Sequence, residues 1–120
     1  APQDPRFSAV IALDGWMVPV PPETIEAGLD VPMLYMGQPE WKGTPLNYEN
    51  LDSLISNSAG FTKKLLISET KHMDYSDAPQ FSNFAKRIGY AGKISSVELK
   101  EILNSETLQF FNTHVRGQGQ

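Results

Sequence analysis

Three short apolar segments, separated by stretches long enough for helices, constrain the fold of this chain most strongly. The segments are Phe7–Leu13, Val31–Met36 and Lys63–Ser68. The first two are almost continuously apolar, which is typical of strands that are buried on both faces of a parallel sheet. Glycine or polar residues follow each segment, so the sequence predicts that each strand ends where a loop begins.

The stretches between and after these strands favour helices. Pro22–Ala27 is predicted to form a short helix that Gly28 ends, and Leu46–Asn57 carries apolar residues at helical spacing. Beyond the third strand, three further helices are predicted: Pro79–Ile88, Val97–Leu103, and a last one that starts at a Ser105 cap and includes Leu108, Phe111 and Val115. Because strands alternate with helices, the sequence predicts an α/β fold with a parallel, doubly wound sheet.

A sheet of this type with three strands is incomplete. At least one edge strand would be left with unpaired backbone groups and apolar side chains. We therefore expect another chain or another segment to complete the sheet. The predicted domain organisation is a flexible lead-in over residues 1–6, one partial α/β domain over residues 7–115 and a disordered tail over residues 116–120. The Pro-rich start of the chain resembles a processed or cut terminus.

Composition excludes several functional classes. The 120 residues carry a formal net charge of −4, so no basic surface is expected that would neutralise nucleic-acid phosphates. The chain contains no cysteine, which excludes disulfides, thiolate metal sites and a cysteine nucleophile. No apolar stretch approaches the roughly 20 residues of a transmembrane helix.

An acid and a histidine follow two of the predicted strands. Asp14 comes directly after the first strand, and His72 lies in the polar loop after the third. The carboxyl ends of parallel strands meet at one edge of the sheet, where doubly wound folds build their sites. An acid that precedes a histidine in this way matches the second and third members of a serine hydrolase triad, as α/β-hydrolases arrange them. We therefore expect Asp14 to orient His72, which would act as the catalytic base.

Alternatives to this pair remain open at this point. Glu40 follows the glycine that ends the second strand and is a rival acid for the triad. Asp14 also fits a simple Asp-Gly turn residue, and His72 also fits an exposed loop histidine. Asp74 and Asp77 lie near His72 in the sequence, but a loop position and a helix cap explain them better than a metal site does. No metal and no cofactor are expected.

The neighbours of the pair are candidates for a substrate pocket. Trp16 and Met17 follow Asp14, and Met73 follows His72. Aromatic and thioether side chains beside a catalytic dyad suit an acyl or lipid pocket. For Met17, ordinary packing in the core is at least as good an interpretation.

These residues resemble one known family. The stretch Ile11–Pro19 is similar to the Ala-Leu-Asp-Ala-Trp-Met-x-Pro segment of the plasma-type platelet-activating factor acetylhydrolases, the group VII phospholipases A2. The stretch His72–Pro79 resembles the segment that begins at the catalytic histidine of this family. Related bacterial and fungal serine esterases are similar too. The resemblance assigns the triad acid to Asp14, a pocket-lining role to Trp16 and the catalytic histidine to His72.

The resemblance covers roughly residues 7–115 and implies the C-terminal half of an α/β-hydrolase fold. It implies a serine ester hydrolase that acts on phospholipid or other carboxylic esters, outside the cell, with peripheral contact to a lipid surface. The Gly-x-Ser-x-Gly motif and the oxyanion-hole donors of the family are absent from this sequence. We therefore expect a partner, an N-terminal half chain that carries the nucleophilic serine. The alternative is a catalytically inactive hydrolase-fold subunit of a heterodimeric lectin, toxin or carrier.

Overall fold

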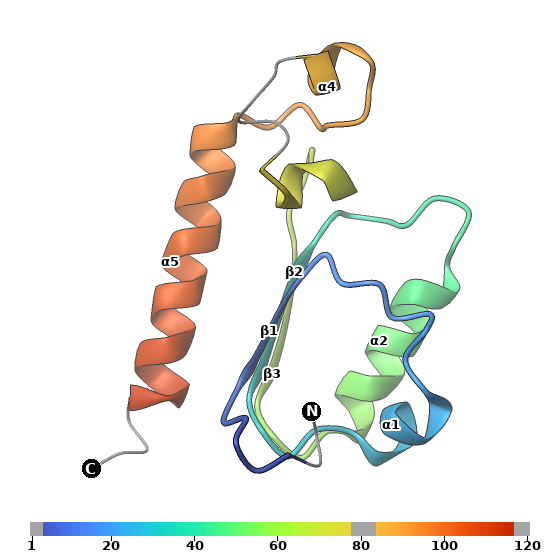
Figure 1. Ribbon diagram of the computed structural model, residues 1–120, viewed down its shortest axis with the longest axis vertical. Coiled ribbons are helices and arrows are strands. Elements are labelled where there is room, and N and C mark those ends of the chain that lie inside the picture. Colours follow the sequence, from blue (N-terminus) through green and yellow to red (C-terminus); the bar gives the residue numbers. More distant parts are fainter. Residues whose placement is uncertain (1–3, 78–83, 117–120) are drawn as a thin grey trace.

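The computed structural model describes residues 4–77 and 84–116, and within them the chain forms a small parallel sheet between helices (Figure 1). The strands lie in the order β1-β2-β3, and both neighbouring pairs are parallel. Their bounds are β1 (Val10–Leu13), β2 (Met33–Gly37) and β3 (Thr62–Leu66). The predicted parallel α/β arrangement is confirmed, although each strand is shorter than its apolar segment.

Helices cover the two faces of the sheet. Helices α1 (Pro22–Ala27) and α2 (Leu46–Asn57) pack on one face, and α5 (Ser96–His114) packs on the other (Figure 1). The predicted bounds of α1 and α2 are confirmed. A single-turn 3₁₀ helix, η1 (His72–Tyr75), and the short α4 (Phe84–Arg87) lie at the end of the sheet where the strands finish. The loop after β3 is therefore partly helical.

Strand β2 is the centre of the core because it is buried on both faces. Met33 and Tyr35 pack on the side of α1 and α2, while Leu34 and Met36 pack on the side of α5. This alternation is the period of two that a strand imposes. The two helical layers thus share a single central strand.

Helix α5 corrects the sequence analysis. Two helices were expected, with a new cap at Ser105, but residues 96–114 form one continuous helix. Its cap is Ser95, whose side chain accepts a hydrogen bond from the backbone of Glu98. The Ser105 hydroxyl instead donates to the Ile102 carbonyl at 3.1 Å, as serines inside helices do. The prediction of a helix start at Ser105 is therefore wrong.

Other expectations fall partly outside the described residues. Residues 78–83 of the predicted helix Pro79–Ile88 are not described, and Phe84–Arg87 are helical as expected. Most of the predicted lead-in and tail, residues 1–3 and 117–120, also lies outside the described part. Among the described helices, none is both long and apolar enough to cross a membrane.

Gly92 joins the segment before α5 to the loop after β3. Its backbone N–H donates to Asp74 Oδ2 at 2.6 Å. A Cβ atom at this position would lie 1.8 Å from the carbonyl oxygen of Glu69, a backbone atom that has little room to move. The two segments therefore meet at a point that only glycine can occupy.

Two tyrosines pack edge to face beneath the end of the sheet. The rings of Tyr35 and Tyr48 lie 6.0 Å apart at 84°. Burial, followed by the nearby charge of Asp14, raises the pKa of Tyr35 to about 12. Burial likewise raises the pKa of Tyr48. Both hydroxyls therefore keep their protons at neutral pH and remain hydrogen-bond donors.

We predict that Gly92→Ala lowers the free energy of unfolding by about 2–3 kcal/mol, because the new methyl group overpacks a backbone contact. Denaturant unfolding of the wild-type and variant chains measures this. Gly43→Ala is the matched control, because a Cβ there meets nothing within 4 Å. The positive φ of Gly43, +75°, limits the expected loss to about 1 kcal/mol. Equal losses for the two variants would contradict the account of Gly92.

We also predict a loss of stability in alkaline solution. Above the unfolded-state tyrosine pKa of about 10, the unfolded chain releases protons that folded Tyr35 retains up to about 12. The free energy of unfolding therefore falls as the pH rises through this window and is insensitive to Tyr35 below it. Urea unfolding at several pH values measures the slope. Tyr35→Phe should make the slope shallower, and an unchanged slope would show that Tyr35 titrates freely in the folded chain.

Candidate active site

Asp14 occupies the position directly after β1, in an unusual backbone conformation. Its φ is +46°, in the left-handed region that Asp tolerates better than most residues. Its backbone N–H donates to the Met36 carbonyl at 2.6 Å, so the turn stays tied to β2. The side chain is fully buried and lies over Gly37, where an added Cβ would come within 2.6 Å of Asp14 Oδ1. The Asp-Gly turn thus directs a carboxylate across the end of the sheet.

The buried carboxylate of Asp14 has hydrogen-bond donors on both oxygens. The backbone N–H of Gln38 donates to Oδ1 at 2.9 Å, and the Gln38 side-chain Nε2 donates to Oδ2 at 3.0 Å. His72 Nδ1 lies 2.8 Å from the same Oδ2. A buried carboxylate requires such partners, because an unpaired one loses its hydration without compensation.

His72 is therefore bound through one ring nitrogen, with the other available. A carboxylate only accepts hydrogen bonds, so the Nδ1–H of His72 is the donor to Asp14. This tautomer leaves Nε2 with a lone pair. The His72 side chain is 57% exposed, in contrast to the fully buried Asp14. The imidazole can thus accept a proton from a group that approaches from outside, while Asp14 fixes its orientation.

Hydrogen bonds on either side of η1 hold the loop that carries His72 in place. Asp74 Oδ2 accepts from the backbone N–H of Lys71 at 2.8 Å, in addition to the Gly92 contact. Thr70 Oγ1 donates to the Ile67 carbonyl at 2.7 Å and lies 3.0 Å from the Tyr75 hydroxyl. The position of His72 is therefore set by the backbone just after β3 and by the segment before α5.

The first turn of α2 supports the segment around Asp14. Asn47 Oδ1 accepts from the backbone N–H of Met17 at 2.6 Å. The Tyr48 hydroxyl donates to the Gln38 carbonyl, and the Tyr35 hydroxyl donates to the Gly15 carbonyl at 3.0 Å. Neutral tyrosines can make these bonds, which agrees with the raised pKa values of both phenols.

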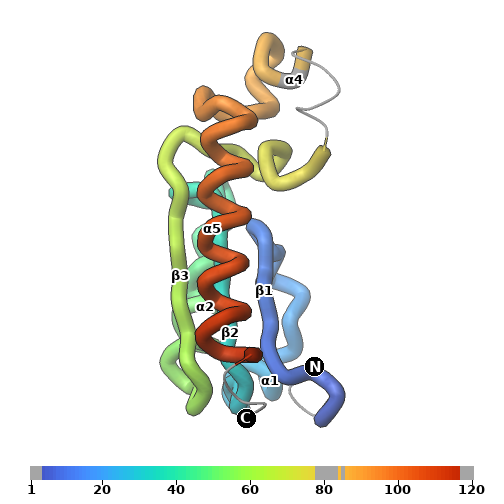
Figure 2. Tube along the Cα trace, turned by 90° about the vertical axis from the view of Figure 1, so that its left-hand side faces the viewer, coloured from blue at the N-terminus to red at the C-terminus, as the bar shows by residue number. Residues whose placement is uncertain are grey.

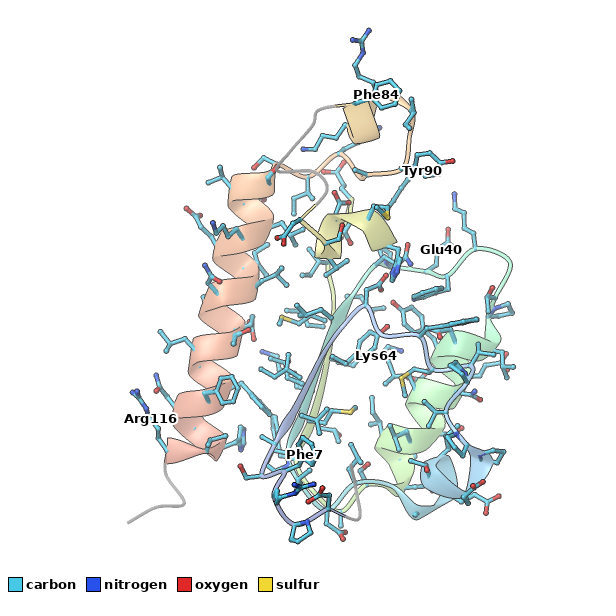
Figure 3. All side chains as sticks on the ribbon, viewed as in Figure 1. Phe7, Glu40, Lys64, Phe84, Tyr90 and Arg116 are labelled. Atoms are coloured by element: carbon cyan, nitrogen blue, oxygen red, sulfur yellow. The ribbon has the colours of Figure 1, made fainter. Side chains whose placement is uncertain are left out.

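A cleft of about 540 Å³ opens beside His72. The Trp41 ring lies 5.1 Å from the His72 ring, and Met73 and Tyr90 also line the cleft. Figure 3 shows Glu40 and Tyr90 on the same side of the molecule, near η1. The charged residues of the lining are Glu40, Lys42, Glu69 and Lys71, so acids and bases balance. The cleft combines an apolar lining with polar groups near a histidine, as small-molecule sites commonly do.

The other predicted site residues take different places. Met73 lines the cleft and is 37% exposed. Glu40 also lines the cleft, but its side chain faces solvent and lies 4.0 Å from Lys42, while His72 hydrogen-bonds to Asp14. Trp16 is 59% exposed and does not line this cleft. Met17 belongs to the core on the side of α1 and α2.

Three residues near His72 were not predicted from the sequence: Gln38, Trp41 and Tyr90. Gln38 directly follows β2, which lies next to β1 in the sheet. Residues that follow neighbouring parallel strands meet at one edge, and this rule would have placed Gln38 near Asp14. Trp41 and Tyr90 lie in loops without a periodic pattern, and nothing in their local sequence places them near His72. The described residues contain no group of three His, Cys, Asp or Glu side chains that would hold a metal ion.

Comparison with known proteins identifies the family of this chain. The family model described as platelet-activating factor acetylhydrolase, isoform II, matches residues 1–119. A curated platelet-activating factor acetylhydrolase from Gallus gallus is 28% identical over 114 residues, which cover 92% of this chain. The match spans 26% of the length of that relative. The chain thus belongs to the family of platelet-activating factor acetylhydrolase, isoform II.

Proposed function

We propose that this chain contributes the acid and the base of a Ser-His-Asp triad in an enzyme that hydrolyses phospholipid-type carboxylic esters. The observation that carries the proposal is the 2.8 Å contact between His72 Nδ1 and Oδ2 of the fully buried Asp14. Membership of the acetylhydrolase family supports an ester substrate. In this assignment Asp14 is the triad acid, and the solvent-facing Glu40 is not.

The proposed reaction uses His72 twice. A serine Oγ attacks the acyl carbonyl while Nε2 of His72 takes the hydroxyl proton, and the proton then passes to the leaving alcohol. Water attacks the acyl-serine in the same way, which releases the carboxylic acid and restores the serine. Asp14 holds the imidazole in the required tautomer and stabilises the imidazolium that forms at each step. Its burial keeps this interaction away from competing water.

The serine and the oxyanion-hole donors belong to a partner segment in this proposal. The chain then represents the C-terminal half of an α/β-hydrolase, and the missing half adds strands to the sheet. Both outer edges of the sheet are free of further strands among the described residues (Figure 2). We assign the partner strand to the edge of β1, because Asp14 directly follows that strand and the serine must come close to His72.

The properties of the two edges support this assignment. Beside the edge of β1, Phe7, Leu13 and Trp16 are between 44% and 59% exposed, and β1 itself carries no charge. Strand β3 instead carries Lys63 and Lys64, which pair with Glu106 of α5 and Asp52 of α2. Lysines on an edge strand disfavour the addition of another strand. The uncharged edge at β1 is the one that suits a partner strand.

The cleft beside His72 is the proposed site for the lipid-like part of the substrate. Its apolar side chains Trp41, Met73 and Tyr90 would contact an acyl chain or ether-linked chain. Trp16 and Met17 remain predicted pocket residues, since the added half of the sheet would change what Trp16 contacts. Contact with a lipid surface and a location outside the cell also remain predictions, which rest on the resemblance alone.

We predict that His72→Gln and Asp14→Asn in the assembled enzyme each lower kcat/KM for ester hydrolysis by about 10³-fold or more. The first change removes the base, and the second removes the acceptor that orients it. His114→Gln is the matched control, because the His114 ring stacks on Phe61 and packs at a tilt against Phe110, away from the site. It should stay within about twofold of the wild type. Unchanged turnover in the His72 variant would exclude the proposed reaction and would favour a catalytically inactive subunit.

The proposed edge is tested by amide hydrogen exchange. The backbone N–H groups of Val10 and Asp14 point toward β2 and donate to the carbonyls of Pro32 and Met36, so by strand alternation the N–H of Ile11 points to the open side. The same alternation turns the N–H of Lys64 outward from β3. We predict that assembly with the serine-bearing segment slows exchange of the Ile11 amide by about a hundredfold and leaves that of Lys64 unchanged. Protection of Lys64 without protection of Ile11 would refute the β1 edge as the interface.

A further inference from the structure

We propose that Gln38 is a positioning residue that sets the orientation of the Asp14 carboxylate and thereby that of His72. The inference rests on the proposed function, because it concerns how the acid of the triad is held. Gln38 lines the cleft, but both its backbone N–H and its side-chain Nε2 donate to the Asp14 carboxylate, so we expect its effect on the reaction to pass through Asp14.

Gln38 donates two hydrogen bonds to the carboxylate of Asp14. Its backbone N–H reaches Oδ1 at 2.9 Å, and its side-chain Nε2 reaches Oδ2 at 3.0 Å. Two donors from one residue to two different oxygens fix the plane of the carboxylate as well as its distance. The backbone bond alone would leave the group free to turn about its Cβ–Cγ bond, so the side-chain amide is the part that determines where Oδ2 points.

Oδ2 is the oxygen that matters for the histidine. It accepts hydrogen bonds from both Nε2 of Gln38 and Nδ1 of His72, the latter at 2.8 Å. The amide thus stabilises the negative charge on the same atom that binds the imidazole. When His72 gains a proton during turnover, its attraction to Oδ2 rises, and the Gln38 amide keeps this oxygen from swinging away.

Gln38 is itself held in place from two directions. Its carbonyl accepts a hydrogen bond from the Tyr48 hydroxyl, which comes from the first turn of α2. Gly37, just before it, has no side chain, and a Cβ there would lie 2.6 Å from Asp14 Oδ1. The bare backbone at Gly37 lets the carboxylate come close enough for both Gln38 donors. This is a rigid support of the kind that catalytic acids need.

Two substitutions separate positioning from space filling. Gln38→Met keeps the length of the side chain and removes the amide donor. Gln38→Glu keeps the shape and replaces the donor with a carboxylate that repels Asp14. If Gln38 only filled space, Gln38→Glu would resemble the wild type. Gln109→Met in α5 is the matched control, because it makes the same chemical change at an exposed site.

Steady-state kinetics of the assembled enzyme with a soluble ester gives the first readout. We expect kcat to fall about tenfold for Gln38→Met and further for Gln38→Glu, with KM within about twofold of the wild type. Gln109→Met should change neither constant. Far-ultraviolet circular dichroism and thermal unfolding establish that the variants remain folded, and Gln38→Met keeps the test decisive if Gln38→Glu fails to fold.

Proton NMR gives a second readout that a structural role would not move. The Nδ1–H proton of His72, bound to a buried carboxylate, should resonate at low field in the wild type. We expect this resonance to shift or broaden in Gln38→Met and to stay in place in Gln109→Met. If His72→Gln and Asp14→Asn abolish turnover while both Gln38 variants keep full kcat and an unchanged resonance, this inference is overturned and the triad stands. If the His72 and Asp14 variants keep turnover, the proposed function fails instead.

Discussion

The buried carboxylate of Asp14 is the constraint on which the functional end of this structure depends. A carboxylate without water must receive hydrogen bonds from the protein. Those bonds come from Gln38 at the end of β2 and from His72 in the loop after β3, so one side chain ties together the ends of all three strands. The left-handed backbone at Asp14 is tolerated because these contacts hold it.

Other parts of the fold hold the residues at this end of the sheet in place. The first turn of α2 holds the segments on both sides of the carboxylate through Asn47 and Tyr48. The loop of His72 is held by Asp74 and by the close approach of Gly92. These supports come from α2 on one side of the sheet and from the segment before α5 on the other. The proposed catalytic pair is thus a property of the whole packed unit.

Much of this was accessible from the sequence. The apolar runs that contain β1 and β2 predicted a parallel α/β arrangement, and the ends of the first and third strands predicted that Asp14 and His72 would meet. Gln38 escaped prediction because a polar residue after a glycine is common in loops, and only the register of β2 against β1 brings it to Asp14. The start predicted at Ser105 failed because a local capping signal was outweighed by the packing of α5, where Leu99 and Phe110 enter one core on either side of it.

In the proposed function, His72 is the base that acts on a serine from outside this chain. The most direct measurement is a crystal structure of the assembled enzyme after reaction with a fluorophosphonate, which modifies the nucleophilic serine. The account predicts that His72 Nε2 lies about 3 Å from the Oγ of the labelled serine while Nδ1 still contacts Asp14. A labelled serine beside a different histidine, or a structure in which His72 has left Asp14, would contradict it.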